Sequence, residues 1–233
     1  MGSRTGQLFR VTTFGESHGE ALGAVIEGCP PGLILDHDAI QQDLDRRRPG
    51  QSRLTTPRNE SDHFQVVSGL FEGQTTGAPL TLVLRNKNHE SKAYDSTRNL
   101  YRPGHADFTY EARYGIRDHR GGGRASARET VARVAAGAVA RQWLAQHYGI
   151  TVLAWVDALQ ELRLMTKPED IIRSDVEANA MRCPDDTLAQ KMIQRVETAK
   201  SNGETLGGCI GWLAQGVPPG LGDPVFDKLE ADL

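Results

Sequence analysis

Three glycines between two arginines, followed by a serine that can cap a helix, are the residues that point most directly to chemistry. Arg120-Gly-Gly-Gly-Arg124 leads into Ser126, and Glu129 stands three residues after that serine. This spacing predicts a capping box at a helix start. Because the first N–H groups of a helix lack internal partners and the helix dipole makes that end partly positive, this start, with Arg128 beside it, is expected to bind an anion such as phosphate. A glycine-rich turn with solvated arginines is the alternative.

Two histidines lie in glycine-containing turns that also carry polar or basic residues. Ser17-His18 stands between two glycines, and His105 follows Arg102-Pro-Gly. An imidazole titrates near neutral pH and suits general acid catalysis. An adjacent Ser-His pair cannot form the relay of a serine hydrolase. Two proton donors and several anion-binding groups would suit the expulsion of phosphate from an organic substrate; a purely structural role for each histidine stays open.

The basic residues are mostly arginine, 21 against 6 lysines. Arginine binds phosphate and carboxylate through a planar fork, whereas lysine acts as a point charge. Arg46, Arg47 and Arg48 either bind a ligand or complement the dipole at a helix C-terminus. Arg53 lies beyond the Pro-Gly pair that ends this helix, so a ligand role is expected for it. A second concentration comprises Arg98, Arg102, Arg113, Arg117, Arg120, Arg124 and Arg128.

Composition narrows the class of protein. The chain has 233 residues, 38% of them hydrophobic, enough for a globular core. Its net charge of −3 and aromatic content of 6% disfavour the alternative of an RNA-binding module. Three widely spaced cysteines indicate a reducing compartment, and the histidines, cysteines and carboxylates lack metal-ligand spacing. Without a signal peptide or a long apolar run, we expect a cytoplasmic protein that binds neither membrane nor nucleic acid.

Hydrophobic periodicity predicts the elements that position these residues. The expected strands are residues 22–29, 64–71, 79–84, 150–159 and 207–217, and the expected helices are residues 38–48, 127–148 and 187–201. The small residues along 127–148 predict a helix buried in the centre of the fold. Residues 86–120 are polar and weakly periodic, and we interpret them as long functional loops.

An internal similarity predicts a repeat. Residues 22–44 contain a strand, Pro30-Pro-Gly-Leu33 and an amphipathic helical pattern, and residues 206–233 repeat this order around Pro218-Pro-Gly-Leu221. We interpret the pair as a two-fold pseudo-repeat whose second half is incomplete. Chance similarity is the alternative.

Four motifs, in this order, resemble the chorismate synthase family: residues 15–19, 43–50, 102–107 and 120–130. The similarity extends from Gly6 to Leu233. It implies an α+β fold, a β-α-β sandwich with long central helices between antiparallel sheets, as one domain over residues 1–233. It also implies a homotetramer.

The activity that the resemblance implies is the 1,4-anti-elimination of phosphate from 5-enolpyruvylshikimate 3-phosphate, which gives chorismate in the shikimate pathway of aromatic amino-acid biosynthesis. The family needs reduced FMN although the reaction has no net redox change. NADPH is a candidate reductant of the flavin, and the sequence leaves open whether the protein reduces its own flavin.

The resemblance also implies residue roles. His18 would assist phosphate departure, and His105 would protonate reduced flavin near N1. The implied substrate-binding residues are Ser17, Arg47, Arg53, Arg102, Ser126 and Arg128. Those implied to contact FMN are Arg124, Ala125 and Ser126, and those implied to contact NADPH are Arg47 and Arg53.

The family pattern continues well past Leu233, with further flavin contacts and a catalytic aspartate. The chain is therefore expected to be an N-terminal portion of such an enzyme. The competing hypothesis is a non-catalytic chain that only binds phosphate ligands.

Overall fold

The computed structural model describes residues 2–55, 60–87, 91–223, 225, 227–228 and 230, with residues 91–93 described by their backbone. The chain divides into two compact units, Met1–Trp143 and Leu144–Leu233. The division falls inside one helix, and each unit has its own hydrophobic core. Every site residue predicted from the sequence belongs to the first unit.

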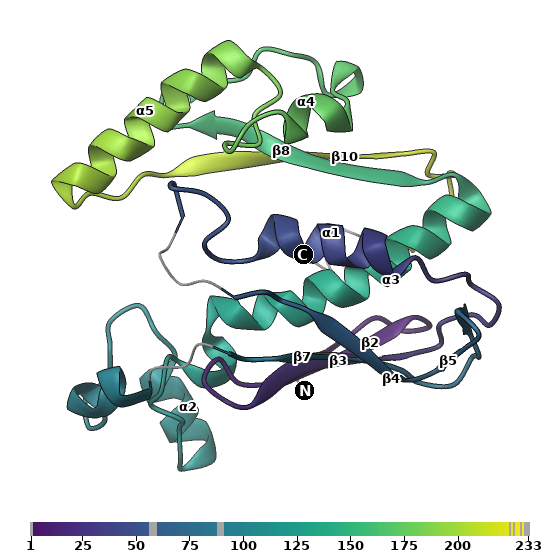
Figure 1. Ribbon diagram of the computed structural model, residues 1–233, viewed down its shortest axis with the longest axis horizontal. Helices are drawn as coiled ribbons and strands as arrows, with labels where there is room; N and C mark the ends of the chain where they lie inside the picture. The colour runs from purple at the N-terminus through teal and green to yellow at the C-terminus, as the bar shows by residue number, and fades with distance from the viewer. Residues whose placement is uncertain are drawn as a thin grey trace. The chain divides into compact units, whose positions relative to one another are not determined.

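The first unit contains a five-stranded antiparallel sheet (Figure 1). Its strands, in spatial order, are β1 (Arg4–Thr5), β2 (Arg10–Gly15), β3 (Ala21–Glu27), β7 (Leu80–Arg85) and β4 (Phe64–Ser68). Since alternate residues of a strand point to the same face, the register of β3 and β7 places one apolar set on one side. That set consists of Leu22, Ala24 and Ile26 opposite Leu84, Leu82 and Leu80.

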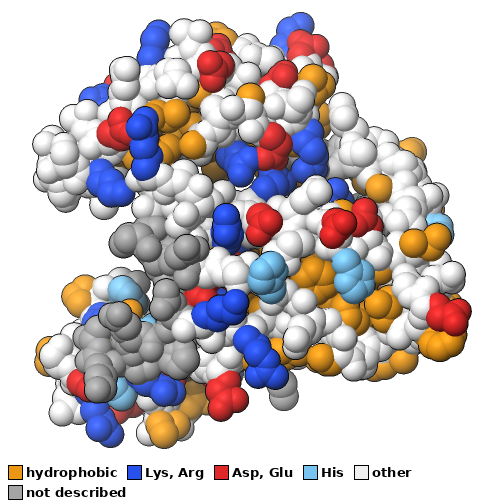
Figure 2. Space-filling model, viewed as in Figure 1, with side chains coloured by type: hydrophobic (Ala, Val, Ile, Leu, Met, Phe, Trp, Pro, Cys, Tyr) orange, Lys and Arg blue, Asp and Glu red, His pale blue; other side chains and the backbone are white. Residues whose placement is uncertain are grey.

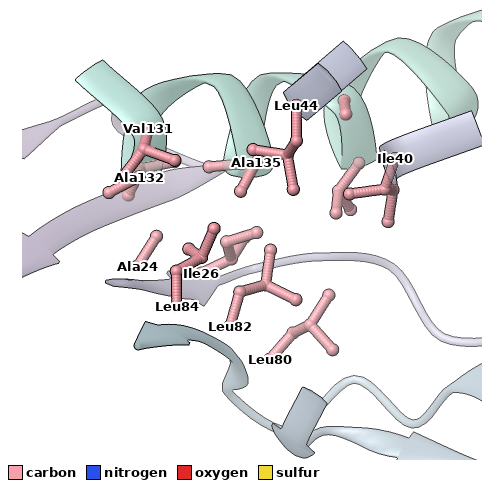
Figure 3. Packing of buried hydrophobic residues seen from close by; sticks show 14 of the residues in the cluster. Ala24, Ile26, Ile40, Leu44, Leu80, Leu82, Leu84, Val131, Ala132 and Ala135 are labelled. Atoms are coloured by element: carbon pink, nitrogen blue, oxygen red, sulfur yellow. The ribbon is translucent and has the colours of Figure 1, made fainter. Parts of the chain in front are cut away.

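Two helices cover this apolar face, α1 (His37–Arg47) and α3 (Thr130–Tyr148). Figure 3 shows Ile40 and Leu44 of α1 and Ala135 of α3 pointing toward the leucines of β7. Asp36 caps α1 by accepting a hydrogen bond from the Ala39 N–H at 3.0 Å. The predicted helix over residues 38–48 is therefore confirmed, and Arg46 and Arg47 lie in its last turn.

Helix α3 begins later than the sequence predicts. Two short 3-10 turns, η2 (Gly123–Ala125) and η3 (Ala127–Glu129), precede it. Its small residues Ala132, Ala135 and Ala136 are buried as expected, whereas Gly137 is exposed. The helix thus packs its small residues against the sheet along one stripe.

Residues 64–71, predicted as one strand, form two. β4 ends at Ser68, and the next pair, β5 (Leu70–Phe71) and β6 (Gln74–Thr75), forms a separate hairpin. Gly69 between them has a φ of +82°, and a Cβ there would lie 2.6 Å from the Leu80 Cα. The chain turns where only glycine fits.

The interpretation of residues 86–120 as long loops is wrong in two places. A 3-10 helix, η1 (Ser91–Thr97), and an α-helix, α2 (Asp107–Tyr114), lie in this segment. Asp107 is the buried residue of α2, and Phe108 and Tyr114 are exposed. α2 is only eight residues long, and its buried side chain is a carboxylate, so it lacks the buried apolar stripe by which longer helices are recognised.

The second unit contains a three-stranded antiparallel sheet in the order β10 (Gly208–Gln215), β8 (Thr151–Leu159), β9 (Leu162–Arg163). Its helices are η4 (Pro168–Asp170), α4 (Arg173–Glu177) and α5 (Asp186–Asn202). Trp155, Val176 and Met192 belong to its core. Asp185 caps α5 and Gly203 ends it with a φ of +70°, so the predicted helix with its terminating glycine is confirmed.

The strand pairs of both units are antiparallel, which confirms the α+β class with antiparallel sheets. Among the described residues, no helix is both long and apolar enough to span a bilayer.

Candidate active site

The Ser17-His18 turn joins β2 to β3 and packs against the glycine run. Both side chains are buried, with exposed fractions of 1% and 7%. The Ser17 hydroxyl donates to the Gly121 carbonyl at 3.1 Å, and the Ser17 N–H donates to the Gly123 carbonyl at 3.3 Å. These bonds hold two motifs that are about a hundred residues apart in the sequence against each other.

Gly121 allows the closest approach in this contact. Its φ is +61°, and a Cβ there would lie 2.1 Å from Cδ2 and 2.4 Å from Nε2 of His18. The glycine run therefore forms a wall against the imidazole that no side chain could replace. The imidazole also meets Tyr94 edge-on, with 5.0 Å between ring centroids.

The capping box at Ser126 is formed in part. Ser126 accepts a hydrogen bond from the Arg128 N–H at 3.3 Å, as an N-cap should. The Glu129 carboxylate pairs with Arg133 at 3.1 Å and with Arg124 at 3.5 Å instead of closing the box. The N–H groups of Arg128 and Glu129 both bond to Ser126, so an anion here would depend on arginine side chains.

Arg47 and Arg128 share one buried carboxylate. Asp62 accepts from Arg47 Nη1 at 2.9 Å and from Arg128 Nη1 at 2.5 Å, and its side chain is fully buried. Arg47 also donates to Thr130 Oγ1 at 3.0 Å and to the Ala127 carbonyl at 3.3 Å. Two predicted anion ligands, one on α1 and one on η3, are thereby brought side by side.

Arg102 is held by the first residue of α2. Its Nε and Nη2 donate to the Asp107 carboxylate at 2.8 Å and 2.9 Å, a bidentate pair. This hydrogen bonding by Arg102, reinforced by its charge and that of Arg117, holds the pKa of Asp107 well below its usual range. The Arg102 guanidinium also lies over Tyr94, 5.8 Å from the ring centroid, so Tyr94 contacts both Arg102 and His18.

His105 lies at the exposed end of the same turn. Its Nδ1 is 3.1 Å from the Pro103 carbonyl, the local contact that the sequence left open as an alternative. Arg53 is likewise exposed. The structure therefore leaves His105 and Arg53 exposed, whereas His18 and Arg128 are buried.

Arg124 has two surroundings. Its guanidinium donates to the Gly15 carbonyl at 2.9 Å and to Thr13 Oγ1 at 2.7 Å, which anchors the end of β2. Together with the exposed Ala125 it also lines a pocket of about 640 Å³. The other residues around this pocket include Glu16, Tyr110, Tyr114, Ile116, Arg117 and Arg120.

Charge in the site is largely balanced. Arg120 pairs with Asp118 at 2.8 Å, and this bond lowers the pKa of the Asp118 carboxyl. Figure 2 shows basic and acidic side chains interspersed over the face in view. Neither kind of charge covers that face alone.

Sequence reasoning missed three residues of the cluster: Asp62, Asn86 and Tyr94. Asn86 bridges Arg128 and the Ser17-His18 turn through its amide. Its position directly after an apolar strand was a usable signal, since polar residues at strand ends often serve a site. Asp62 and Tyr94 stand in segments without any pattern that would single them out.

Comparison with known proteins adds the family. The chorismate synthase family model matches residues 9–233. The chorismate synthases of Rippkaea orientalis and Thermosynechococcus vestitus are 51% and 53% identical to the chain over 233 residues, all of this chain and 64% of each relative. A solved chain titled "Crystal Structure of Chorismate Synthase" matches with a TM-score of 0.73 and 29% identity, over 94% of this chain and 62% of that one.

The chain thus spans less than two thirds of the length of these relatives. The match nevertheless covers both units and all four motifs that carried the resemblance. The chain belongs to the chorismate synthase family.

Proposed function

We propose that the protein acts as a chorismate synthase, eliminating phosphate and a ring hydrogen from 5-enolpyruvylshikimate 3-phosphate. The observation that carries this proposal is the buried Ser17-His18 turn, packed on the glycine run and linked through Asn86 to Arg128. It places a titratable imidazole and a guanidinium in one connected cluster. Elimination breaks one C–O and one C–H bond and forms one C=C bond, so the leaving phosphate needs charge stabilisation and a proton.

His18 is the proposed proton donor to the departing phosphate. Its imidazole is walled by Gly121 and Tyr94, which fixes the ring and excludes water from most of its surface. A fixed donor lowers the barrier because its orientation is set before the reaction. Ser17 and Ser126 are proposed to add hydrogen bonds to the substrate.

Arg47, Arg53, Arg102 and Arg128 are the proposed ligands of the phosphate and carboxylates. Around Asp62, two guanidiniums and one carboxylate leave one positive charge. The carboxylate holds both guanidiniums in place, so an arriving anion meets a preorganised pair instead of two flexible side chains. Asp107 balances the charge of Arg102. We therefore propose that Arg102 orients the substrate through hydrogen bonds, and that Arg47 and Arg128 supply the net positive charge.

Reduced FMN is the proposed cofactor, and the pocket beside Arg124 and Ala125 supports a fit. Its volume of about 640 Å³ lies within the range of cofactor pockets, and aromatic, apolar, arginine and acidic side chains line it. When bound, reduced FMN would supply transient reducing power while phosphate leaves. His105, exposed and two residues before Asp107, is proposed to protonate the flavin near N1. NADPH, held by Arg47 and Arg53, is proposed as its reductant.

We also propose a cytoplasmic homotetramer that binds neither nucleic acid nor membrane, with residues 1–233 as one functional domain of sandwich architecture. The pseudo-two-fold repeat has some support. β2–β3 and β8–β10 are both antiparallel pairs, each followed by Pro-Pro-Gly-Leu, and Gly32 and Gly220 have φ values of +82° and +92°. Leu33 is buried and Leu221 exposed, so the two copies differ in packing.

The test is an anaerobic assay of the complete protein with reduced FMN and 5-enolpyruvylshikimate 3-phosphate. We expect chorismate and phosphate in equal amounts. His18→Ala should lower turnover by about 10²- to 10⁴-fold, the usual contribution of a general acid. His147→Ala, at the exposed end of α3, should leave it unchanged.

Two outcomes would contradict the proposal separately. Absence of chorismate from the wild-type protein would refute the activity. Full turnover by His18→Ala would remove His18 from the mechanism. The same assay on residues 1–233 alone decides whether this part only binds phosphate ligands.

A further inference from the structure

Asn86, the first residue after β7, uses its whole amide inside the candidate site. It is buried, and its Nδ2 donates to the Glu16 carbonyl at 3.2 Å and to the Gly19 carbonyl at 2.8 Å. Its Oδ1 accepts from Arg128 Nε at 3.0 Å. Its backbone N–H donates to the Glu20 carbonyl at 3.0 Å, so the main chain is fixed as well.

The partners of the amide determine its orientation. The NH₂ group faces two carbonyl oxygens, and the oxygen faces a guanidinium N–H. A flipped amide would oppose oxygen to oxygen and N–H to N–H, which costs the desolvation of buried polar groups. The side chain therefore has a single orientation that satisfies its surroundings.

The two carbonyls stand on either side of Ser17-His18. Glu16 precedes the pair and Gly19 follows it, so one NH₂ group closes the turn that carries the imidazole. At the other end of the amide, Arg128 continues to Asp62. Asn86 thus connects the histidine turn directly to the shared arginine–carboxylate cluster.

We propose that Asn86 is a positioning residue that sets the separation between the His18 imidazole and the Arg128 guanidinium. This inference rests on the proposed function, since both groups must reach the same leaving phosphate. An elimination with a fixed proton donor and a fixed cation is sensitive to displacements of about 1 Å, which can cost about 100-fold in rate.

Asn86→Asp tests the two ends of the Asn86 amide separately, because it keeps the acceptor and removes the donors. The new carboxylate still accepts from Arg128 Nε, but it loses both donors and places an oxygen against the Glu16 and Gly19 carbonyls. In the complete protein we expect kcat to fall by about 100-fold, and KM for the phosphorylated substrate should rise as well, because the added negative charge beside Arg128 weakens anion binding. Asn86→Ala, which also releases Arg128 but adds no charge, should lower kcat with a smaller rise in KM.

A matched control lies in the second unit. The Asn179 amide donates to the Cys183 carbonyl at 2.8 Å and accepts from the Met181 N–H at 3.1 Å, so it closes a turn in the same way. Asn179→Ala should lower Tm about as much as Asn86→Ala and leave kcat and KM of the folded protein unchanged. If Asn86 only stabilises the fold, the two asparagines will behave alike in kinetics, and the proposal is overturned.

A second readout does not depend on turnover. In ¹H–¹⁵N spectra of histidine-labelled protein, with His18→Gln to assign the signal, Asn86→Ala should move the His18 ring resonances and leave those of exposed His147 in place. Asn179→Ala should move neither. Unmoved His18 resonances in Asn86→Ala would overturn the inference even if the protein is an active chorismate synthase. Failure of the wild-type protein to form chorismate would instead refute the proposed function, and the spectra would still report on the link.

Discussion

At the scale of single residues, each arginine of the buried cluster has a partner in the chain itself. Arg47 and Arg128 share Asp62, and Arg102 pairs with Asp107. The sequence could indicate that arginines gather here, because they cluster in the motifs. It could not indicate that carboxylates remote in sequence or in a following turn neutralise part of their charge, since no local pattern marks Asp62.

Gly121 offers a direct test of the contact with His18. Gly121→Ala would introduce a Cβ 2.1 Å from His18 Cδ2 at a φ of +61°. Gly73→Ala is the control, because Gly73 has a φ of +80° and nothing within 4 Å of the added Cβ. In urea unfolding, we expect Gly121→Ala to lower the free energy of unfolding by about 1–3 kcal/mol more than the control does, which is the usual cost of overpacking. Equal losses of stability in the two variants would mean that Gly121 and His18 can move apart for the added methyl group at no cost in free energy.

Asp107 makes the stability depend on pH. Its folded-state pKa is lowered, chiefly by hydrogen bonds from Arg102, so the ionised carboxylate stabilises the fold above its unfolded pKa of about 3.9. That contribution is lost as the pH falls from there toward the folded-state pKa. The free energy of unfolding of the wild type should exceed that of Asp107→Asn by about 2 kcal/mol at pH 7. This difference should become smaller below about pH 4.

Glu27→Gln is the control for this pH dependence. Glu27 pairs with Arg10 at 3.4 Å, and half of its side chain is exposed. An exposed ion pair contributes about 1 kcal/mol or less to stability. The free energies of unfolding of wild type and Glu27→Gln should therefore differ little at every pH. If the difference in free energy of unfolding between wild type and Asp107→Asn stays constant from pH 7 to pH 3, the ion pair with Arg102 is contradicted.

At the scale of elements, the sequence predicts what its own local signals specify. α1 and α5 begin at aspartate caps, α5 ends at a left-handed glycine, and β3 and β7 read as apolar strands. The elements it missed include β1, β2, β6, β9, α2 and α4, which have short lengths or few buried apolar side chains. Their formation depends on tertiary pairing, such as β2 with β3 and Asp107 with Arg102, which has no local signature.

The same distinction explains the candidate site. His18, Ser17 and the glycine run come from motifs, and the structure places them together. Asn86 and Asp62 depend on where the end of β7 and the segment before β4 lie in space. A strand order of β3–β7–β4 is needed to see that residues 18, 62 and 86 belong to one cluster.

At the scale of the whole molecule, the sequence predicts one domain, and the structure has two compact units with separate cores. Leu82 is fully buried in the first core and Met192 in the second. Each truncation to alanine should cost about 2–5 kcal/mol, because it removes buried methyl and methylene groups and leaves a cavity. The two variants therefore apply a similar destabilisation to different units.

Hydrogen exchange followed by mass spectrometry shows which segments each of the two variants destabilises. If each core stabilises its own unit, Leu82→Ala should speed exchange in peptides of β3, β7 and α1 and leave those of β8, β10 and α5 near wild type. Met192→Ala should give the reverse pattern. Faster exchange throughout the chain in both variants would mean that the units unfold together, in which case the two cores form one cooperative domain as the sequence predicts.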